Sequence, residues 1–212
     1  RKRCHFCYYR VYTDKNASEV AAYLDVVARE WELYATQPAI AGRPLNFVYF
    51  GGGTPSFLSV KQLQSLVDRL TAVTPWTSAE EITFECEPGT LTEPKLAQIR
   101  DMGITRLSLG LEHFDDEVLE LNGRAHRSAE IFRAYGFAQS LDFPQINIDL
   151  IVGMLGDTDE RWRNAVARTI DMSPDSVTIY QMELPYNTTI SSDLLQGTGQ
   201  FAERVADWDT KR

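Results

Sequence analysis

The sequence predicts an α/β protein with a parallel sheet, built either as an open doubly wound sheet or as a partial barrel. Short runs rich in Val, Ile, Phe, Tyr and Leu alternate with longer segments whose apolar residues recur at helical spacing. Polar or glycine-rich residues follow each short run, which is where ligands gather in both folds. Local patterning leaves the two folds open because it does not determine the order of the strands.

The expected elements follow one another along the chain as five β-α units. Each expected strand is short and rich in β-branched or aromatic residues, and the strands cover 46–50, 81–87, 106–111, 146–152 and 176–183. The expected helices cover 17–36, 59–73, 92–102, 127–140 and 158–171. The last of these helices begins at Thr158, a residue type that caps helix N-termini.

Composition indicates a single globular domain without membrane spans. The 212 residues are 43% hydrophobic and 24% charged, and no apolar run approaches the roughly 20 residues of a membrane helix. A net charge of −9 argues against broad nucleic-acid binding, with Arg1-Lys2-Arg3 as a local basic exception. Three cysteines are too few for a disulfide framework, so we expect a reducing cytoplasm.

Cys4 and Cys7 form a C-x-x-C pair in a segment dense with aromatic residues. Two thiolates at this spacing can bind one metal ion or cluster, but the pair alone also fits a zinc site, a redox dithiol or chance. We interpret His5, between them, as structural. Cys86 lies inside an expected strand, and we expect it to be a core residue.

Three glycines, Gly51, Gly52 and Gly53, directly follow the first expected strand and precede Thr54 and Pro55. Residues without a side chain allow the backbone to approach a ligand closely, although a flexible turn would look the same. The run is not a phosphate-binding loop, because no Gly-Lys-Ser/Thr sequence follows it.

Taken in order, the motifs resemble those of radical S-adenosylmethionine (SAM) enzymes of the oxygen-independent coproporphyrinogen III oxidase group. The similar segments are 4–7, 49–56, 81–92, 103–112, 122–126, 147–154 and 180–188. The resemblance implies a partial (β/α)6 TIM-like barrel whose first strand is missing from this chain. Residues 1–190 would form the radical SAM core, and 191–212 would start a truncated C-terminal extension.

The resemblance also implies the cofactors and their ligands. A 4Fe–4S cluster would be held by Cys4, Cys7 and a third cysteine immediately before Arg1, and SAM would bind its open iron. The chain would therefore be truncated at the first cluster cysteine and inactive as it stands. The residues implied in SAM binding are Phe6, Gly51, Gly52, Gly53, Thr54, Glu85, Glu112, Arg124, Asp149 and Ile151. Without the resemblance, Glu85 and Asp149 would still need polar partners, because an unpaired charge is costly to bury in a sheet.

Two departures separate this chain from the oxidases themselves. Glu112 occupies a position where they have Gln, and Tyr9 occupies one where they have a further Cys. The oxidase-like subgroup remains, which includes heme chaperones and radical methylases or cyclopropanases. We expect a radical SAM oxidoreductase with a small-molecule substrate such as a tetrapyrrole, and an electron donor such as flavodoxin or ferredoxin. On a heme chaperone, His113 and His126 would be the imidazole candidates.

Overall fold

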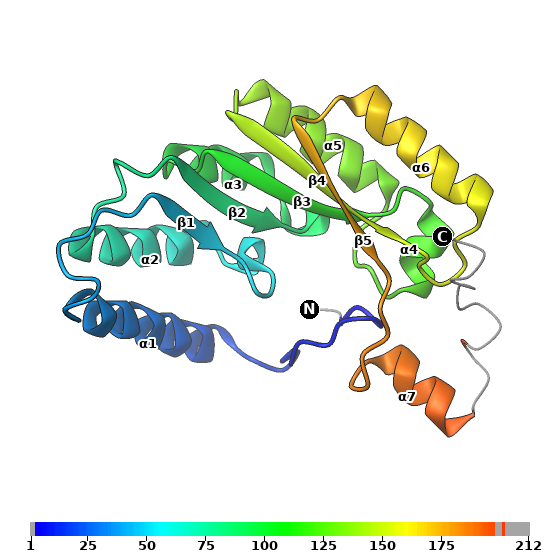
Figure 1. The fold of residues 1–212 in the computed structure, drawn as a ribbon, viewed down its shortest axis with the longest axis horizontal. Coiled ribbons are helices and arrows are strands. Elements are labelled where there is room, and N and C mark those ends of the chain that lie inside the picture. Colours follow the sequence, from blue (N-terminus) through cyan, green and yellow to red (C-terminus); the bar gives the residue numbers. More distant parts are fainter. Residues whose placement is uncertain (1–2, 198–200, 202–212) are drawn as a thin grey trace.

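A computed structural model describes residues 3–197 and residue 201 of the chain. Its centre is a five-stranded parallel sheet in the order β1-β2-β3-β4-β5 (Figure 1). The strands are β1 (Phe47–Phe50), β2 (Glu81–Cys86), β3 (Arg106–Glu112), β4 (Gln145–Val152) and β5 (Ser176–Gln181). Each strand lies beside the one before it, whereas a doubly wound sheet reverses direction at a switch point. The sheet is therefore that of an open barrel, with β1 and β5 unpaired to each other among the described residues.

All five expected helices are present, and their starts follow local capping chemistry. They are α1 (Ala17–Ala35), α2 (Val60–Val73), α3 (Glu93–Asp101), α5 (Ser128–Ser140) and α6 (Asp159–Met172). Asn16 caps α1 in a capping box with Glu19, and Thr158 accepts a hydrogen bond from the backbone of Arg161 at the start of α6, as expected from the sequence.

Two further helices were not expected from the sequence. The first is α4 (Asp116–Leu121), whose six residues are too few to show helical periodicity, although Asp115 caps it by accepting from two backbone N–H groups. The second is α7 (Thr189–Gln196), which crosses the expected domain boundary between residues 190 and 191. Most of the expected extension, at 198–200 and 202–212, lies outside the described residues.

The two faces of the sheet differ in polarity because successive strand side chains point in opposite directions. On β3, Leu107, Leu109 and Leu111 are fully buried in the main core beneath the helices. The alternate residues Ser108 and Gly110 line a cavity on the other face. Burying each of these leucines stabilises the fold by about 1.5–3 kcal/mol, so the helix-covered face anchors the sheet and leaves the other face free for chemistry.

An irregularity at the carboxyl end of β3 orients the last residue of the strand. The pairing of β3 with β4 shifts between Gly110 and Glu112, and Glu112 has a φ of +64°. This left-handed conformation is uncommon for a residue with a side chain and accompanies many functional sites. Among the described residues, no helix is long and apolar enough to cross a membrane.

Candidate functional site

A cavity of about 650 Å³ opens at the carboxyl ends of the strands. Its walls come from β2 to β5, the glycine loop after β1 and the N-terminal segment. Eight residues expected at a cofactor site line it: Phe6, Gly53, Thr54, Glu85, Glu112, Arg124, Asp149 and Ile151. The remaining four, Cys4, Cys7, Gly51 and Gly52, are not part of the lining, and two of them are joined to it by hydrogen bonds.

The glycine loop is organised by the carboxylate of Glu85. One oxygen of Glu85 accepts a hydrogen bond from the Tyr49 hydroxyl at 2.6 Å, and the other accepts from the backbone N–H of Gly52 at 3.2 Å. A Cβ atom on Gly51 would lie 2.3 Å from Cε1 of Tyr49 and 2.8 Å from the carboxyl carbon of Glu85. Only glycine therefore fits at this position, and Glu85 has the polar partners that the sequence required.

Tyr49 was not singled out from the sequence, where it reads as one more aromatic residue of a strand. Its side chain points to the polar face, since its hydroxyl reaches Glu85 on the neighbouring strand. Partial burial raises the pKa of Tyr49, and the hydrogen bond and negative charge of Glu85 raise it further. Tyr49 therefore stays protonated and acts as a hydrogen-bond donor to this carboxylate.

Asp149 lies on β4 in a network of neutral donors. Its carboxylate accepts from the Ser108 hydroxyl at 2.7 Å and from the Asn147 side-chain amide at 2.8 Å. Burial raises the pKa of Asp149, and these hydrogen bonds oppose the rise. Ser108 and Asn147 were not recognised as site residues, although both lie on the same strand faces as Gly110 and Asp149 at period-2 spacing.

Arg124 connects the cavity to the cysteine loop. It is 8% exposed, and its guanidinium donates to the Gly110 carbonyl at 2.7 Å and to the Cys4 sulfur at 3.3 Å. Its Nη1 lies 3.4 Å from a carboxylate oxygen of Glu112, and its Nε is buried without a hydrogen-bond partner. A buried cation with one unused donor can accept a further anionic group at this point.

Glu112 is the acid nearest to Arg124. Burial raises the pKa of Glu112 to about 7. The positive charge of Arg124 opposes this rise, and the negative charges of Asp149, Glu87 and Glu85 add to it. The side chain is thus poised to change charge near neutral pH. The Gln found at this position in the resembling oxidases has no such titration.

The cysteine loop is held against the end of α4. His5 donates its backbone N–H to the Asn122 carbonyl at 3.0 Å, and its ring Nδ1 lies 2.8 Å from the Leu121 carbonyl. Both Cys4 and Cys7 are unpaired and partly exposed. Two thiols are an incomplete ligand set for a cluster, and no group of three or more His, Cys, Asp or Glu side chains among the described residues could hold a metal ion.

The two histidines considered as heme ligands are both occupied. His113 is fully buried, with Nδ1 accepting from the Asp115 backbone at 2.9 Å and Nε2 lying 3.4 Å from a carboxylate oxygen of Asp157. His126 is 1% exposed, with Nδ1 2.6 Å from Glu87 and Nε2 3.2 Å from the Leu111 carbonyl. Neither ring is accessible to heme iron in this conformation, because both are buried, although His113 Nε2 makes no hydrogen bond.

The predicted core role of Cys86 is confirmed. This residue is 4% exposed, and burial raises the pKa of its thiol. Phe6 and Ile151, two of the residues that the resemblance implies in SAM binding, meet in one apolar cluster with Val118, Met154 and Met182. An aromatic base could therefore pack beside this cluster at the wall of the cavity.

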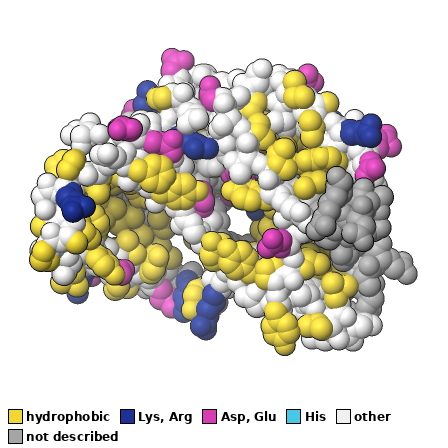
Figure 2. Space-filling view, in the orientation of Figure 1, with side chains coloured by type: hydrophobic (Ala, Val, Ile, Leu, Met, Phe, Trp, Pro, Cys, Tyr) yellow, Lys and Arg dark blue, Asp and Glu magenta, His cyan; other side chains and the backbone are white. Residues whose placement is uncertain are grey.

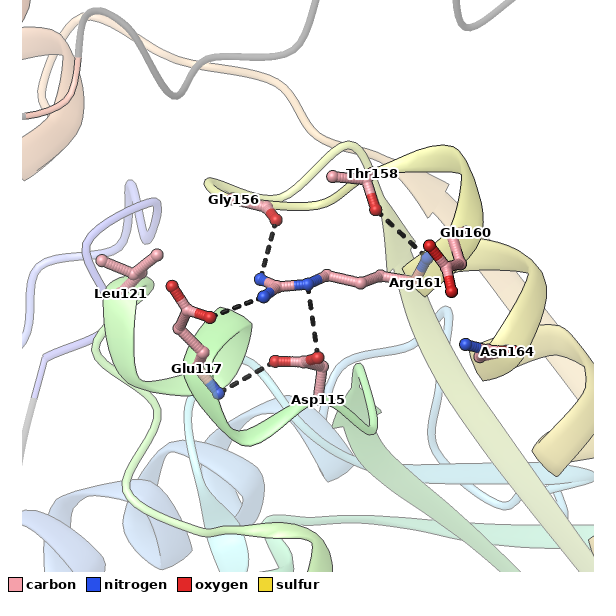
Figure 3. Close-up of a pocket in the computed structure, with 8 residues that line it drawn as sticks. All are labelled: Asp115, Glu117, Leu121, Gly156, Thr158, Glu160, Arg161 and Asn164. Carbon is pink, nitrogen blue, oxygen red and sulfur yellow. Dashed lines mark hydrogen bonds and ion pairs between the residues drawn. The ribbon is translucent and has the colours of Figure 1, made fainter.

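A second hollow of about 570 Å³ lies between α4 and the start of α6 (Figure 3). Arg161 extends across it and contacts the Glu117 carboxylate at 2.5 Å, the Asp115 carboxylate at 3.4 Å and the Gly156 carbonyl at 3.1 Å. Because these partners already satisfy the cation of Arg161, the hollow offers no free positive charge to a ligand. None of the expected site residues lines it.

Fold and site together define an open β/α barrel that builds a ligand cavity from a cysteine loop, a glycine loop and polar strand ends. The chain belongs to the radical SAM superfamily, whose family model matches residues 1–168. The family expected from the ordered motifs is thereby confirmed.

Curated relatives and solved structures place the chain near two kinds of protein. It is 28% identical over 195 residues to the heme chaperone HemW of Bacillus subtilis, covering 92% of this chain and 51% of that protein. It is 30% identical over 179 residues to the oxygen-independent coproporphyrinogen III oxidase of Escherichia coli, covering 84% of this chain and 39% of that protein. The structure of E. coli coproporphyrinogen III oxidase (HemN) matches with a TM-score of 0.81 and 26% identity, covering 96% of this chain and 45% of that one. The chain thus spans about half the length of these relatives, or less.

Proposed function

We propose that the full-length protein binds a 4Fe–4S cluster and SAM in this cavity and cleaves SAM reductively. The observation that carries the proposal is the single cavity that joins the cysteine loop, through Arg124, to the glycine loop and the buried acids. In the full-length protein, Cys4 and Cys7 would hold the cluster together with the third cysteine that the resemblance implies. When bound, the cluster supplies one electron, which breaks the C5′–S bond of SAM to give methionine and a 5′-deoxyadenosyl radical.

The charges of the cavity are complementary to those of SAM, which has an ammonium group, a sulfonium centre and one carboxylate. Glu85 and Asp149 would attract the cationic and hydroxyl groups, and the unused donor of Arg124 would bind the carboxylate. The backbone of Gly51, Gly52 and Gly53 would contact the methionyl amino group. Phe6 and Ile151 would pack against adenine. Thr54 and Glu112 complete the proposed cofactor contacts.

The test is SAM cleavage by full-length protein reconstituted anaerobically with iron and sulfide. With a chemical reductant, the wild type should release 5′-deoxyadenosine. Asp149→Asn should weaken SAM binding by roughly tenfold or more, because it weakens charge-assisted hydrogen bonds worth about 1.5–3 kcal/mol. Asp171→Asn, an exposed site on α6, is the matched control and should behave as wild type. A cluster-loaded wild type that forms no 5′-deoxyadenosine would disprove the enzyme proposal.

We also propose a second candidate function, a heme chaperone on the same scaffold, because several relatives carry the name heme chaperone HemW. Heme titration of the full-length protein separates the two functions. Tight heme binding without SAM turnover would favour the chaperone. Replacing His113 or His126 should not weaken heme binding through loss of an iron ligand, since both rings are occupied.

The names of the relatives and the free cysteines also support proposals for the substrate, the electron donor and the compartment. We infer a small-molecule substrate, such as a tetrapyrrole, because relatives are named for coproporphyrinogen III and heme. A protein such as flavodoxin or ferredoxin would supply the electron. The three free cysteines support a reducing compartment such as the cytoplasm.

A further inference from the structure

The cysteine loop, residues 3–8, has little internal support. It lies outside the helices and strands, and one backbone hydrogen bond, from the Cys7 N–H to the Cys4 carbonyl at 3.1 Å, joins two of its own residues. Phe6 and Tyr8 line the cavity, so one side of the loop borders the hollow that Figure 2 shows at the centre of the molecule. The conformation of the loop therefore depends on contacts with other parts of the chain.

Three residues that follow β5 contact this loop, and we call them the clamp: Asn187, Ile190 and Phe201. At the start of α7, Ile190 donates its backbone N–H to the His5 carbonyl at 3.2 Å, and the ring centres of Phe201 and His5 lie 5.6 Å apart. The Asn187 side chain donates to the Tyr8 carbonyl at 2.6 Å. In Figure 1 the dark-blue loop accordingly lies beside the start of the orange helix α7.

The clamp is itself fixed by burial. Ile190 is fully buried, Phe201 is 5% exposed, and both pack with Leu155 in an apolar cluster that Phe6 of the loop also contacts. The backbone N–H of Phe201 donates to the Asp193 carboxylate at 3.0 Å, which ties Phe201 to α7. The residue between the two cysteines therefore rests against an anchored apolar surface.

Arg3 extends the connection to the second cysteine. Its guanidinium donates to the Asn187 carbonyl at 3.0 Å and to the Cys7 carbonyl at 3.1 Å. The backbone carbonyls of Cys7 and Tyr8 are thus both connected to Asn187, the first through Arg3 and the second directly. The match to the family model ends at residue 168, so the clamp lies in the part of the chain that follows it.

Given the proposed function, we propose that the clamp is part of the cluster site and that its residues position Cys4 and Cys7 for binding iron. Both thiolates must face one cluster, and a loop without regular structure would otherwise lose its conformational freedom at the moment of binding. Contacts that orient the ligands of a metal site typically change metal affinity by about 10–100-fold. The clamp contacts the neighbours of the two cysteines rather than their sulfur atoms, so Asn187, Ile190 and Phe201 are positioning residues.

The experiment measures how fast full-length, cluster-loaded protein loses its iron to an excess of chelator without oxygen, followed by the visible absorbance of the cluster. Asn187→Ala removes one exposed side chain and its hydrogen bond to the loop, and Phe201→Ala removes the ring beside His5. Both variants should lose the cluster about tenfold faster than the wild type, or more. Phe201→Leu keeps most of the apolar packing and should recover most of the difference.

Phe143→Ala and Asn164→Ala are the matched controls. Phe143 is 7% exposed, close to the value for Phe201, but it belongs to the main core, and Asn164 is exposed on α6. Phe143→Ala should destabilise the cluster-free protein in urea at least as much as Phe201→Ala does, yet both controls should lose the cluster at the wild-type rate.

Two results would overturn the clamp proposal alone: wild-type retention of the cluster in Asn187→Ala and Phe201→Ala, or equally fast loss in Phe143→Ala and Phe201→Ala, which would reduce the effect to general stability. A wild type that binds no cluster would overturn the proposed function, and the clamp proposal with it. A wild type that holds the cluster but forms no 5′-deoxyadenosine would overturn the enzyme proposal alone.

Discussion

Replacing Glu112 by Gln should make the stability of the fold less dependent on pH. The Glu112 side chain is 13% exposed and lies 3.4 Å from Arg124. Burial raises its pKa from the ordinary 4.5 to about 7. The folded state therefore binds this proton more tightly than the unfolded state does. Stability from Glu112 is greatest below pH 4.5 and is lost as pH rises through about 7.

The size of the effect follows from proton linkage. One unit of pKa shift corresponds to about 1.36 kcal/mol of unfolding free energy. Most of the shift from 4.5 to about 7 titrates between pH 5 and pH 8, so the free energy of unfolding falls by roughly 2–3 kcal/mol over this range. Gln has nearly the same shape and keeps an oxygen acceptor beside Arg124, but it does not titrate. Any pH-independent difference in unfolding free energy between the variant and wild type cancels when two pH values are compared.

Urea unfolding of the cluster-free protein at pH 5, 6, 7 and 8 measures this difference. The free energy of unfolding of Glu112→Gln should rise relative to wild type by roughly 2–3 kcal/mol across the range. Glu30→Gln, an exposed position on α1, is the control and should keep a constant difference. A difference for Glu112→Gln that stays constant or shrinks as pH rises would refute the reasoning.

Three further predictions test the glycine loop and the core. Gly51→Ala should weaken SAM binding by about tenfold or more in the full-length, cluster-loaded protein, because the added methyl group would displace Glu85. Gly136→Ala is its control: the new Cβ meets nothing within 4 Å in α5, so unfolding should cost about 0.5–1 kcal/mol more and titration calorimetry should show unchanged binding. A thiol reagent should modify Cys86 only on unfolding, since burial raises its pKa, and rapid reaction in the folded protein would contradict its core position. Leu107→Ala should lower the free energy of unfolding by about 2–5 kcal/mol in urea, and a loss below about 1 kcal/mol would show that the site is not tightly packed.

The elements of this fold were largely predictable from local pattern. The alternation of β3 between buried leucines and cavity residues is a period-2 signal, and the caps of α1 and α6 are short-range hydrogen bonds. Six residues of α4 were too short a segment to recognise. The ordered motifs also located eight cavity-lining residues, because strand ends in a parallel sheet meet at one edge.

What the sequence by itself determined was the family, the β-α order and the residue types available at each strand end. Only the tertiary structure decided which of them meet. Tyr49 and Glu85 are 36 residues apart, and Arg124 and Cys4 are 120 apart, yet each pair is in hydrogen-bond contact. The pKa of Glu112 depends in the same way on burial, and the contact of His113 with Asp157 depends on a neighbour far along the chain. The order of the strands is also set by long-range pairing. Those quantities arise from packing in three dimensions, which local residue pattern does not encode.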